Sequence, residues 1–226
     1  MQLVAYGAQD IYLTGNPQIT FFKVVYRRHT NFSMECVEQV FSGTPNFGRK
    51  AICTVTRNGD LVTRMYLMAT MPKLSAGNAW CRRVGYAMLK SVEVEIGGTK
   101  IDKHYGNWLN IWHELTHDPN HDRAHDKMVG NTDACCLPST DGVPQTVLYV
   151  PLEFWFNRNT GLALPLIALQ YHEVRVEFEF ETLENLICSD DNVEGRQSVG
   201  TLQLVDSSLL VDYVYLDSEE RRRFAQ

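Results

Sequence analysis

The sequence has no long apolar run, no leader pattern at its start and no surplus of basic charge. No uninterrupted apolar stretch approaches the roughly 18 residues that a membrane-spanning helix needs, so we expect no membrane span. The first ten residues lack a basic segment followed by an apolar one, so we expect no secretory signal. The 27 acidic and 21 basic residues give a net charge of −6. Direct binding to nucleic acid is therefore not expected, because phosphates attract a basic surface.

Motifs that usually mark an active site are also missing. The six cysteines are dispersed without a CxxC pair, and we interpret them as reduced thiols in a protein that folds inside the cell. No Gly-rich phosphate loop, serine-nucleophile elbow or paired-carboxylate motif stands out. We therefore expect no cofactor and no enzymatic activity, and a protein that acts through its surfaces.

Strict alternation of apolar and polar residues is the strongest signal that is present. The run 173–181 alternates Val or Phe with Glu or Arg, and 148–156 carries a second apolar track. A period of two with β-branched and aromatic residues is typical of a half-buried strand. Phe32, Met34, Cys36 and Val40 form the apolar set of another such strand. Further strands are predicted at 19–26, 51–55, 61–71, 92–96 and 202–216.

Turn residues and one helical pattern separate these strands. Asn58-Gly59-Asp60 predicts a hairpin, and Gly97-Gly98 predicts a two-residue turn that sets Glu95 opposite Lys100 and Val94 opposite Ile101. Helical spacing predicts one helix, with a buried stripe and an end at Pro119. That stripe is Trp108, Ile111, Trp112 and Leu115. Polar loops are expected at 75–85, 118–145 and 184–200.

The pattern as a whole favours an all-β fold. About eight strands and one short helix occur without regular helix–strand alternation, which predicts an eight-stranded antiparallel jelly-roll sandwich with long loops. Chains of this length commonly form a single β domain.

One connection between predicted strands is unusually apolar. Residues 157–169 contain turn formers that bracket a cluster of leucines, including Leu162, Leu164 and Leu166 around Pro165. Two interpretations fit this segment: a packed corner folded over the end of the sandwich, or a surface that another subunit covers.

His113-Glu114-Leu115-Thr116-His117 matches the HExxH pattern of zinc hydrolases. There, two histidines one helical turn apart hold zinc and the glutamate activates water. The predicted buried stripe turns His113 and His117 toward solvent, and the extended motif is absent. We therefore expect no metal, with His113 and His117 as the candidates if one binds.

Two further clusters have two interpretations each. Histidines recur every four residues from His113 to His125, near Cys135-Cys136; a solvated polar loop is favoured over a structural zinc site. The basic run Arg221, Arg222 and Arg223 lies beside acidic residues, which favours ion pairing or a subunit contact over DNA binding.

Several long blocks, collinear from end to end, resemble the major capsid proteins of large nucleocytoplasmic double-stranded DNA viruses, of the chlorella-virus, mimivirus and iridovirus type. The first begins LVAYGAQDIYLTGNPQITFF, and the last is VDYVYLDSEERRRFAQ. Between them, Arg57 to Leu61, Val94 to Tyr105 and the stretches YVPLEFWF and GLALPLIALQYHEV also match the family's pattern.

The resemblance implies a double jelly roll, of which this chain would supply the amino-terminal half. It implies an arm at 1–18, a jelly-roll domain at 19–217, and a linker at 218–226 toward a second jelly roll that lies outside this chain. The chain could be a truncated form, one product of a split gene, or a variant that assembles from single rolls.

The resemblance also implies a function and partners. Three chains would form a homotrimer, the pseudo-hexameric capsomer of an icosahedral capsid, together with minor capsid proteins and the second jelly-roll half. The protein would be located in the virion capsid, assembled in the host cytoplasm.

The favoured hypothesis is therefore a structural virion protein that self-assembles. Its expected assembly contacts lie in the arm, the corner and the tail: Tyr6, Asp10, Tyr12, Leu162, Leu164, Pro165, Leu166, Arg221, Arg222 and Arg223. One alternative is a jelly-roll module that binds a glycan or receptor through 118–145. Another is a zinc hydrolase that uses His113, Glu114 and His117.

Overall fold

A computed structural model describes residues 7–8, 15, 17, 20–24, 29–190 and 200–225. Two sheets form its body, and every strand pairing within them is antiparallel. The first sheet has the order β1 (Phe32–Val40), β11 (Asp206–Leu216), β3 (Leu61–Met71) and β7 (Thr146–Pro151), with β8 (Leu164–Pro165) also beside β3. The second has the order β2 (Lys50–Val55), β9 (Val174–Phe180), β5 (Leu89–Ile96) and β6 (Thr99–His104).

The shorter elements lie outside these sheets. A separate strand pair joins β4 (Asn78–Trp80) to β10 (Ile187–Ser189). The α-helices are α2 (Val84–Ala87), α3 (Gly106–Thr116), α4 (Asp122–Val129), α5 (Asp133–Cys136), α6 (Trp155–Arg158) and α7 (Ser218–Ala225). Two single 3-10 turns are η1 (Thr160–Leu162) and η2 (Leu183–Asn185). Among the described residues, no helix is both long and apolar enough to cross a membrane.

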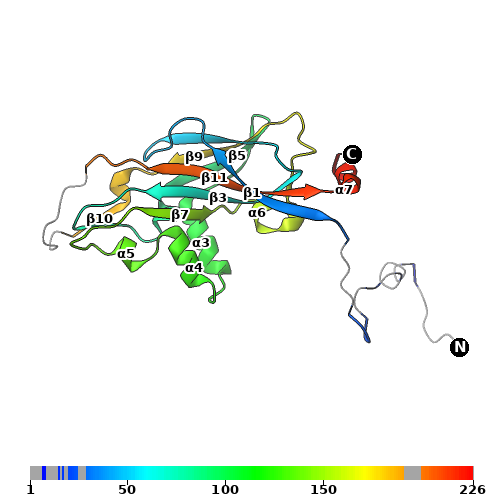
Figure 1. Cartoon of the computed structure of the whole chain (residues 1–226), viewed down its shortest axis with the longest axis horizontal. Coiled ribbons are helices and arrows are strands. Elements are labelled where there is room, and N and C mark those ends of the chain that lie inside the picture. The colour runs from blue at the N-terminus through cyan, green and yellow to red at the C-terminus, as the bar shows by residue number, and fades with distance from the viewer. Residues whose placement is uncertain are drawn as a thin grey trace.

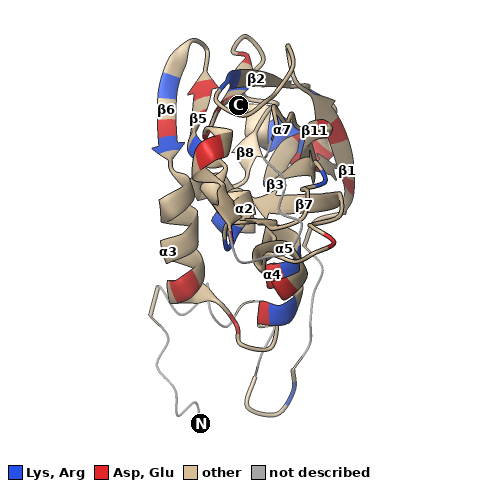
Figure 2. Cartoon of the chain, turned by 90° about the vertical axis from the view of Figure 1, so that its left-hand side faces the viewer, with Lys and Arg blue, Asp and Glu red and all other residues tan. Residues whose placement is uncertain are grey.

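The two sheets pack face to face as a sandwich. Figure 1 shows the first sheet with β9 and β5 behind it, α3 and α4 beside β7, and α7 near the start of β1. Figure 2 looks along the sandwich and separates β5 and β6 from β1, β11 and β3. Apart from the β5–β6 hairpin, neighbouring strands in the two sheets are not consecutive in sequence, because the intervening chain crosses to the other sheet. This topology confirms the predicted eight-stranded antiparallel jelly roll.

The core lies between the sheets and is built by alternation. On β9 the four apolar side chains from Val174 to Phe180 are buried, as predicted, while the intervening charges are not. Phe178 meets Phe41 edge to face, with ring centroids 5.3 Å apart. Tyr213 on β11 is fully buried and donates its hydroxyl to the Thr56 carbonyl at 2.6 Å. Burial of each such aromatic side chain stabilises the folded state by about 1.5–3 kcal/mol.

The β5–β6 hairpin forms at the predicted glycines. Gly97 and Gly98 have φ of 58° and 84°, a region in which side chains other than glycine are strained. Glu95 lies opposite Lys100, as predicted. Val94 instead lies opposite Asp102 and not Ile101, because a β-bulge follows Val94 and shifts the register by one residue.

Four predictions of element type are wrong. The strand predicted over 148–156 ends at Pro151 in β7, and helix α6 begins at Trp155. The 58–60 turn is not a hairpin, because it joins β2 to β3, which belong to different sheets. The sequence predicts a strand at 19–26, but Thr20 and Lys23 close a turn there. Positions 19, 25 and 26 lie outside the described residues. The predicted loops contain short elements: β4 and α2, then α4 and α5, then β10. These elements have too few residues to show a clear period.

A cluster of ion pairs on β5 and β6 gives a test of stability against pH. Glu93 pairs with Lys100 and with Lys103, and these contacts lower the pKa of its carboxyl from 4.5 to about 2. Since the folded state lowers this pKa, the stabilisation is complete above pH 4.5 and is lost as the pH falls toward 2.

We expect Glu93→Gln to lower the free energy of unfolding by about 1 kcal/mol at pH 7, because both lysines are partly exposed and solvent screens the pair. The deficit should disappear near pH 2. Urea unfolding of the two proteins across this range measures it. Glu95→Gln on the same strand is the control, and an equal loss from both variants would contradict the assignment.

Candidate functional site

The two outer faces of the sandwich differ in chemistry. On the second sheet the outer face carries a ladder of charges: Lys50 lies 3.1 Å from Glu177, and Lys90 lies 2.7 Å from Glu179. Figure 2 shows basic and acidic positions alternating along β6 beside β5. Charges that are paired with one another and solvated leave little apolar surface for a partner, so this face is suited to contact with water.

The outer face of the first sheet is mainly apolar at both of its edges, and Glu38 is the exposed charge among the outward residues of β1. On β1, Val40 is 79% exposed while its neighbour Gln39 is 4% exposed. Phe32 and Met34 also project outward, and on β7 Val147 and Tyr149 do the same. We call this surface the outer apolar face, defined by Phe32, Met34, Val40, Val147 and Tyr149.

Partly buried apolar side chains lie between these two edges. Met68 on β3 faces Tyr149 across the β3–β7 pair, and Tyr66 faces Leu210 across the β3–β11 pair. The apolar surface is thus carried by all four strands of the first sheet. An exposed apolar surface on a sheet is a typical mark of an interaction site.

The orientation of β1 corrects the expectation from alternation. Taken alone, the pattern places the apolar set of 32–40 inside, yet Met34 is 55% exposed and Val37 packs against the core instead. The strand is predicted correctly, but its faces are inverted. The sequence carries no clear signal of this, because Gln39 is kept inside by a contact that only the fold creates: its side chain accepts from the Thr56 hydroxyl at 2.7 Å.

The apolar corner divides into a buried and an exposed part. Leu164 and Leu166 are buried in the core of the chain, which matches the packed-corner interpretation and leaves them inaccessible as contacts in this structure. Pro165 is partly buried in β8, and Leu162 is half exposed. Arg57 fixes the following turn, because its guanidinium donates to the carbonyl oxygens of residues 169, 170 and 172. An assembly contact in this corner therefore stays a prediction for Leu162 and Pro165 only.

The basic tail forms helix α7 and is engaged in ion pairs. Arg221 Nε lies 3.0 Å from the carboxylate of Asp60, which also accepts from the backbone N–H of Leu216 at 2.8 Å. Arg223 pairs with Glu220 at 3.1 Å, and Arg222 donates to the carbonyl of its own helix at residue 218. The ion-pairing interpretation is confirmed for Arg221 and Arg223, and a subunit contact there stays a prediction. The arm residues Tyr6, Asp10 and Tyr12 lie outside the described residues.

Helix α3 turns a different face to the core than the sequence predicts. Leu109 is buried, whereas Ile111 is half exposed and Leu115 is 75% exposed. The start of α3 packs closely against α2 at Gly106, because an added Cβ there would lie 2.0 Å from the Tyr86 carbonyl oxygen. The His113 side chain is only 13% exposed, so the prediction that it faces solvent is wrong, whereas His117 is exposed as predicted.

His113 and His125 stack face to face between α3 and α4. Their ring centroids are 3.7 Å apart with an angle of 7° between the planes, and His117 lies 5.3 Å from His113. The Tyr86 hydroxyl lies 2.7 Å from His125 Nε2. Burial, followed by the charge of His113, lowers the pKa of His125 to about 4, and burial followed by Arg83 lowers that of His113. Both imidazoles are thus neutral at pH 7, and they hold two helices together by packing.

The residues of the HExxH pattern make other contacts. Glu114, which would have to activate water, pairs instead with Arg83 at 2.5 Å. Asp122 lies 3.9 Å from His113 and 3.5 Å from His117. Within the described part of the chain, no group of three or more His, Cys, Asp or Glu residues is arranged to hold a metal ion.

Comparison with known proteins identifies the relatives of the chain. The family model "Major capsid protein N-terminus" matches residues 20–217. The major capsid protein of Pyramimonas orientalis virus is 55% identical over all of this chain and 55% of its own length. The major capsid protein of Paramecium bursaria Chlorella virus 1 is 44% identical over all of this chain and 49% of its own length. The chain spans about half the length of the curated relatives it matches.

Solved structures give the same result for the fold. The crystal structure of PBCV-1 VP54 has a TM-score of 0.76 at 39% identity, covering 92% of this chain and 48% of that one. The Faustovirus major capsid protein has a TM-score of 0.71 at 11% identity, covering 97% of this chain and 60% of that one, and it supports the fold alone.

The stacked histidines give a test by acidification. Because burial lowers the pKa of His125 below its usual 6.5, the unfolded chain binds this proton first, and stability falls as the pH drops from 6.5 toward 4. Charges around the ring come from His113 and Arg83, which oppose protonation, and from Asp122 and Asp126, which favour it.

We expect His125→Phe to reduce this acid-dependent loss by about 1–2 kcal/mol, after allowance for partial exposure to solvent. Thermal unfolding at a series of pH values between 7 and 4 measures it. His121→Gln, at an exposed neighbouring histidine, should leave the profile unchanged. A wild-type slope in the His125 variant would show that the stacked pair does not set the acid sensitivity.

Proposed function

The chain belongs to the family of viral major capsid proteins, and we propose that it is a structural subunit of an icosahedral virion shell. Its mechanism is assembly: surfaces of the jelly roll bury apolar area against neighbouring subunits, and many weak contacts add up across the shell. No chemical step is part of this function. The relatives support it, because those matched over the whole chain are named capsid proteins.

The outer apolar face is the observation that carries the proposal. A sandwich that works alone in water is expected to place polar side chains on both outer faces. Here one face has them and the other exposes Phe32, Met34 and Val40 along a single strand. This asymmetry fits a subunit whose first sheet packs against another protein surface while its second sheet remains in water.

A second jelly roll is the proposed occupant of this face. The chain corresponds to about half the length of the two relatives from Pyramimonas orientalis virus and Phaeocystis pouchetii virus, and the proposed partner corresponds to the half that it does not match. The predicted linker at 218–226 contains helix α7, which follows β11 and would lead toward that half. Three such pairs would form the pseudo-hexameric capsomer, with minor capsid proteins at its margins. We place the assembled protein in the virion capsid and its assembly in the host cytoplasm.

Charge on the outer apolar face should prevent assembly. We expect the double variant Met34→Glu, Tyr149→Glu to weaken association with the second half or with other copies at least tenfold, because two carboxylates would be desolvated in the interface. Sedimentation velocity of the purified protein, alone and mixed with the second half of a relative, measures the change.

Ile101→Glu supplies the matched control. Ile101 on β6 is 52% exposed, close to the 55% of Met34, but it belongs to the second sheet. This variant should associate like the wild type. If both variants associate normally while circular dichroism shows them folded, the outer apolar face is not the interface.

Purified virus particles give an independent test of the shell function. Peptides of this chain should be among the most abundant in mass spectra of washed particles, because a shell subunit is present in many copies. Intact mass shows whether the chain occurs there at 25.8 kDa or as part of a longer polypeptide. Absence of its peptides from the particles would refute the proposal.

A further inference from the structure

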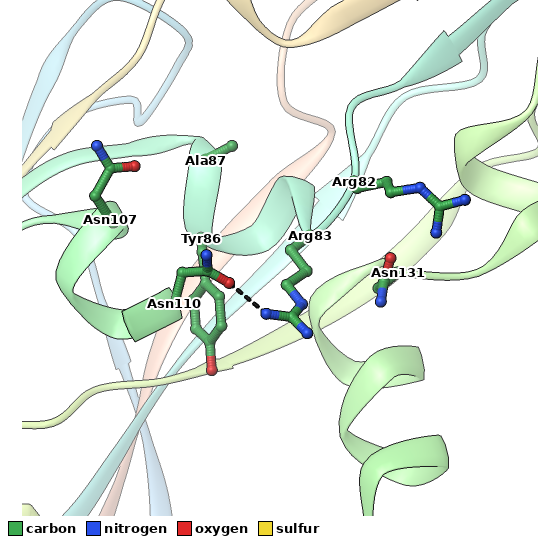
Figure 3. Close-up of a pocket in the computed structure, with 8 residues that line it drawn as sticks. Arg82, Arg83, Tyr86, Ala87, Asn107, Asn110 and Asn131 are labelled. Atoms are coloured by element: carbon green, nitrogen blue, oxygen red, sulfur yellow. Dashed lines mark hydrogen bonds between the residues drawn. The ribbon is translucent and has the colours of Figure 1, made fainter. Parts of the chain in front are cut away.

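A polar pocket lies between α2, the start of α3 and the end of α4. Its volume is about 420 Å³, which is within the range of small-molecule sites. Figure 3 shows the side chains around it: two arginines precede α2, two asparagines come from α3, and one asparagine follows α4. The side chains of the lining that can form hydrogen bonds are those of Arg82, Arg83, Tyr86, Asn107, Asn110 and Asn131. None of the described residues that line it is acidic.

The two arginines have different roles in this pocket. Arg83 is anchored, because its guanidinium donates to the Asn110 side chain (dashed in Figure 3) and pairs with Glu114. It also has φ of 52°, and it is the one non-glycine residue with positive φ in the described chain. A strained backbone held by side-chain contacts is typical of functional positions. Arg82 is exposed, and among the described contacts its guanidinium makes no hydrogen bond or ion pair.

The asparagines supply both donors and acceptors. Asn131 donates from Nδ2 to the Asp126 carboxylate at 2.8 Å, which fixes the orientation of its amide. Its Oδ1 atom is buried and has no hydrogen-bond partner. A buried acceptor without a partner costs about 1–3 kcal/mol, so a ligand that donates a hydrogen bond to it would be stabilised there. Asn107, at the opposite side of the pocket in Figure 3, adds a second amide.

We propose that this pocket binds an acidic monosaccharide unit, with its carboxylate against Arg82 and its hydroxyl groups on the amides of Asn131 and Asn107. The planar guanidinium matches a carboxylate through two parallel hydrogen bonds. An amide side chain both donates to and accepts from a hydroxyl group, which a bare inorganic anion would not use. Glu114 pairs with Arg83, so Arg82 is the lining charge that is left to attract an anionic ligand.

Titration of the full chain with three probes tests the proposal: glucuronate, glucose and inorganic phosphate. Binding is measured from the nuclear magnetic resonance shifts of the asparagine side-chain amides. Glucuronate should bind with a Kd on the order of 1 mM, and glucose at least tenfold more weakly. Arg82→Gln should weaken glucuronate binding at least tenfold without unfolding the chain, because Arg82 is exposed.

Arg123→Gln is the control, since Arg123 is an exposed arginine on α4 outside the pocket lining. It should bind glucuronate like the wild type. Equal affinity for glucose and glucuronate would overturn the role of the carboxylate, and equal affinity for phosphate would reduce the pocket to a site for any anion. If Arg82→Gln binds glucuronate like the wild type and has a wild-type melting curve, the ligand does not bind at this pocket.

Discussion

The structure depends on the burial of one alternating side-chain set from each sheet against the other. Val176 and Phe178 from β9 and Leu209 and Val211 from β11 have no exposed surface, and such sets fill the space between the two sheets. A shift of one residue in any strand would exchange its inner and outer sets. The hydrophobic contact therefore fixes the register, the turns and finally what each outer face presents.

What each outer face presents is where the two sheets diverge. The charged ladder around Glu93 and Glu179 uses the polar set of β5 and β9 in the ordinary way. The first sheet presents apolar residues on both faces, which alone would favour aggregation. In a shell protein the same property is useful, because the surface that water disfavours is the surface that a neighbour covers. The helices beside β7 carry the remaining local chemistry: the stacked imidazoles of His113 and His125, and the arginine pocket beside them.

The sequence predicts the strands better than their orientation. Strand β3 has the predicted bounds, and β9 (Val174–Phe180) lies one residue inside its predicted run at each end, because its apolar residues alternate with charged ones. Strand β1 is also predicted, but its sequence does not decide which of its two alternating side-chain sets faces the core. Gln39 is inside, where it makes a hydrogen bond, and Val40 is outside. For α3, the tight approach at Gly106 decides which face packs, and periodicity does not contain that information. The pocket was not predicted, since Arg82 and Asn131 meet only through the packing of α2, α3 and α4.

The strand order has a consequence for how the chain reaches this state. Strand β1 pairs along its whole length with β11, so the first strand of the sheet depends on the last one for its backbone hydrogen bonds. On a ribosome, β1 emerges long before β11 is made, and until then its hydrogen-bonding edge and its apolar residues are open to other chains. Non-local pairing of this kind slows folding, because a large loop must close first. Production of such a subunit therefore benefits from protection of the nascent chain, well before any lattice exists to use it.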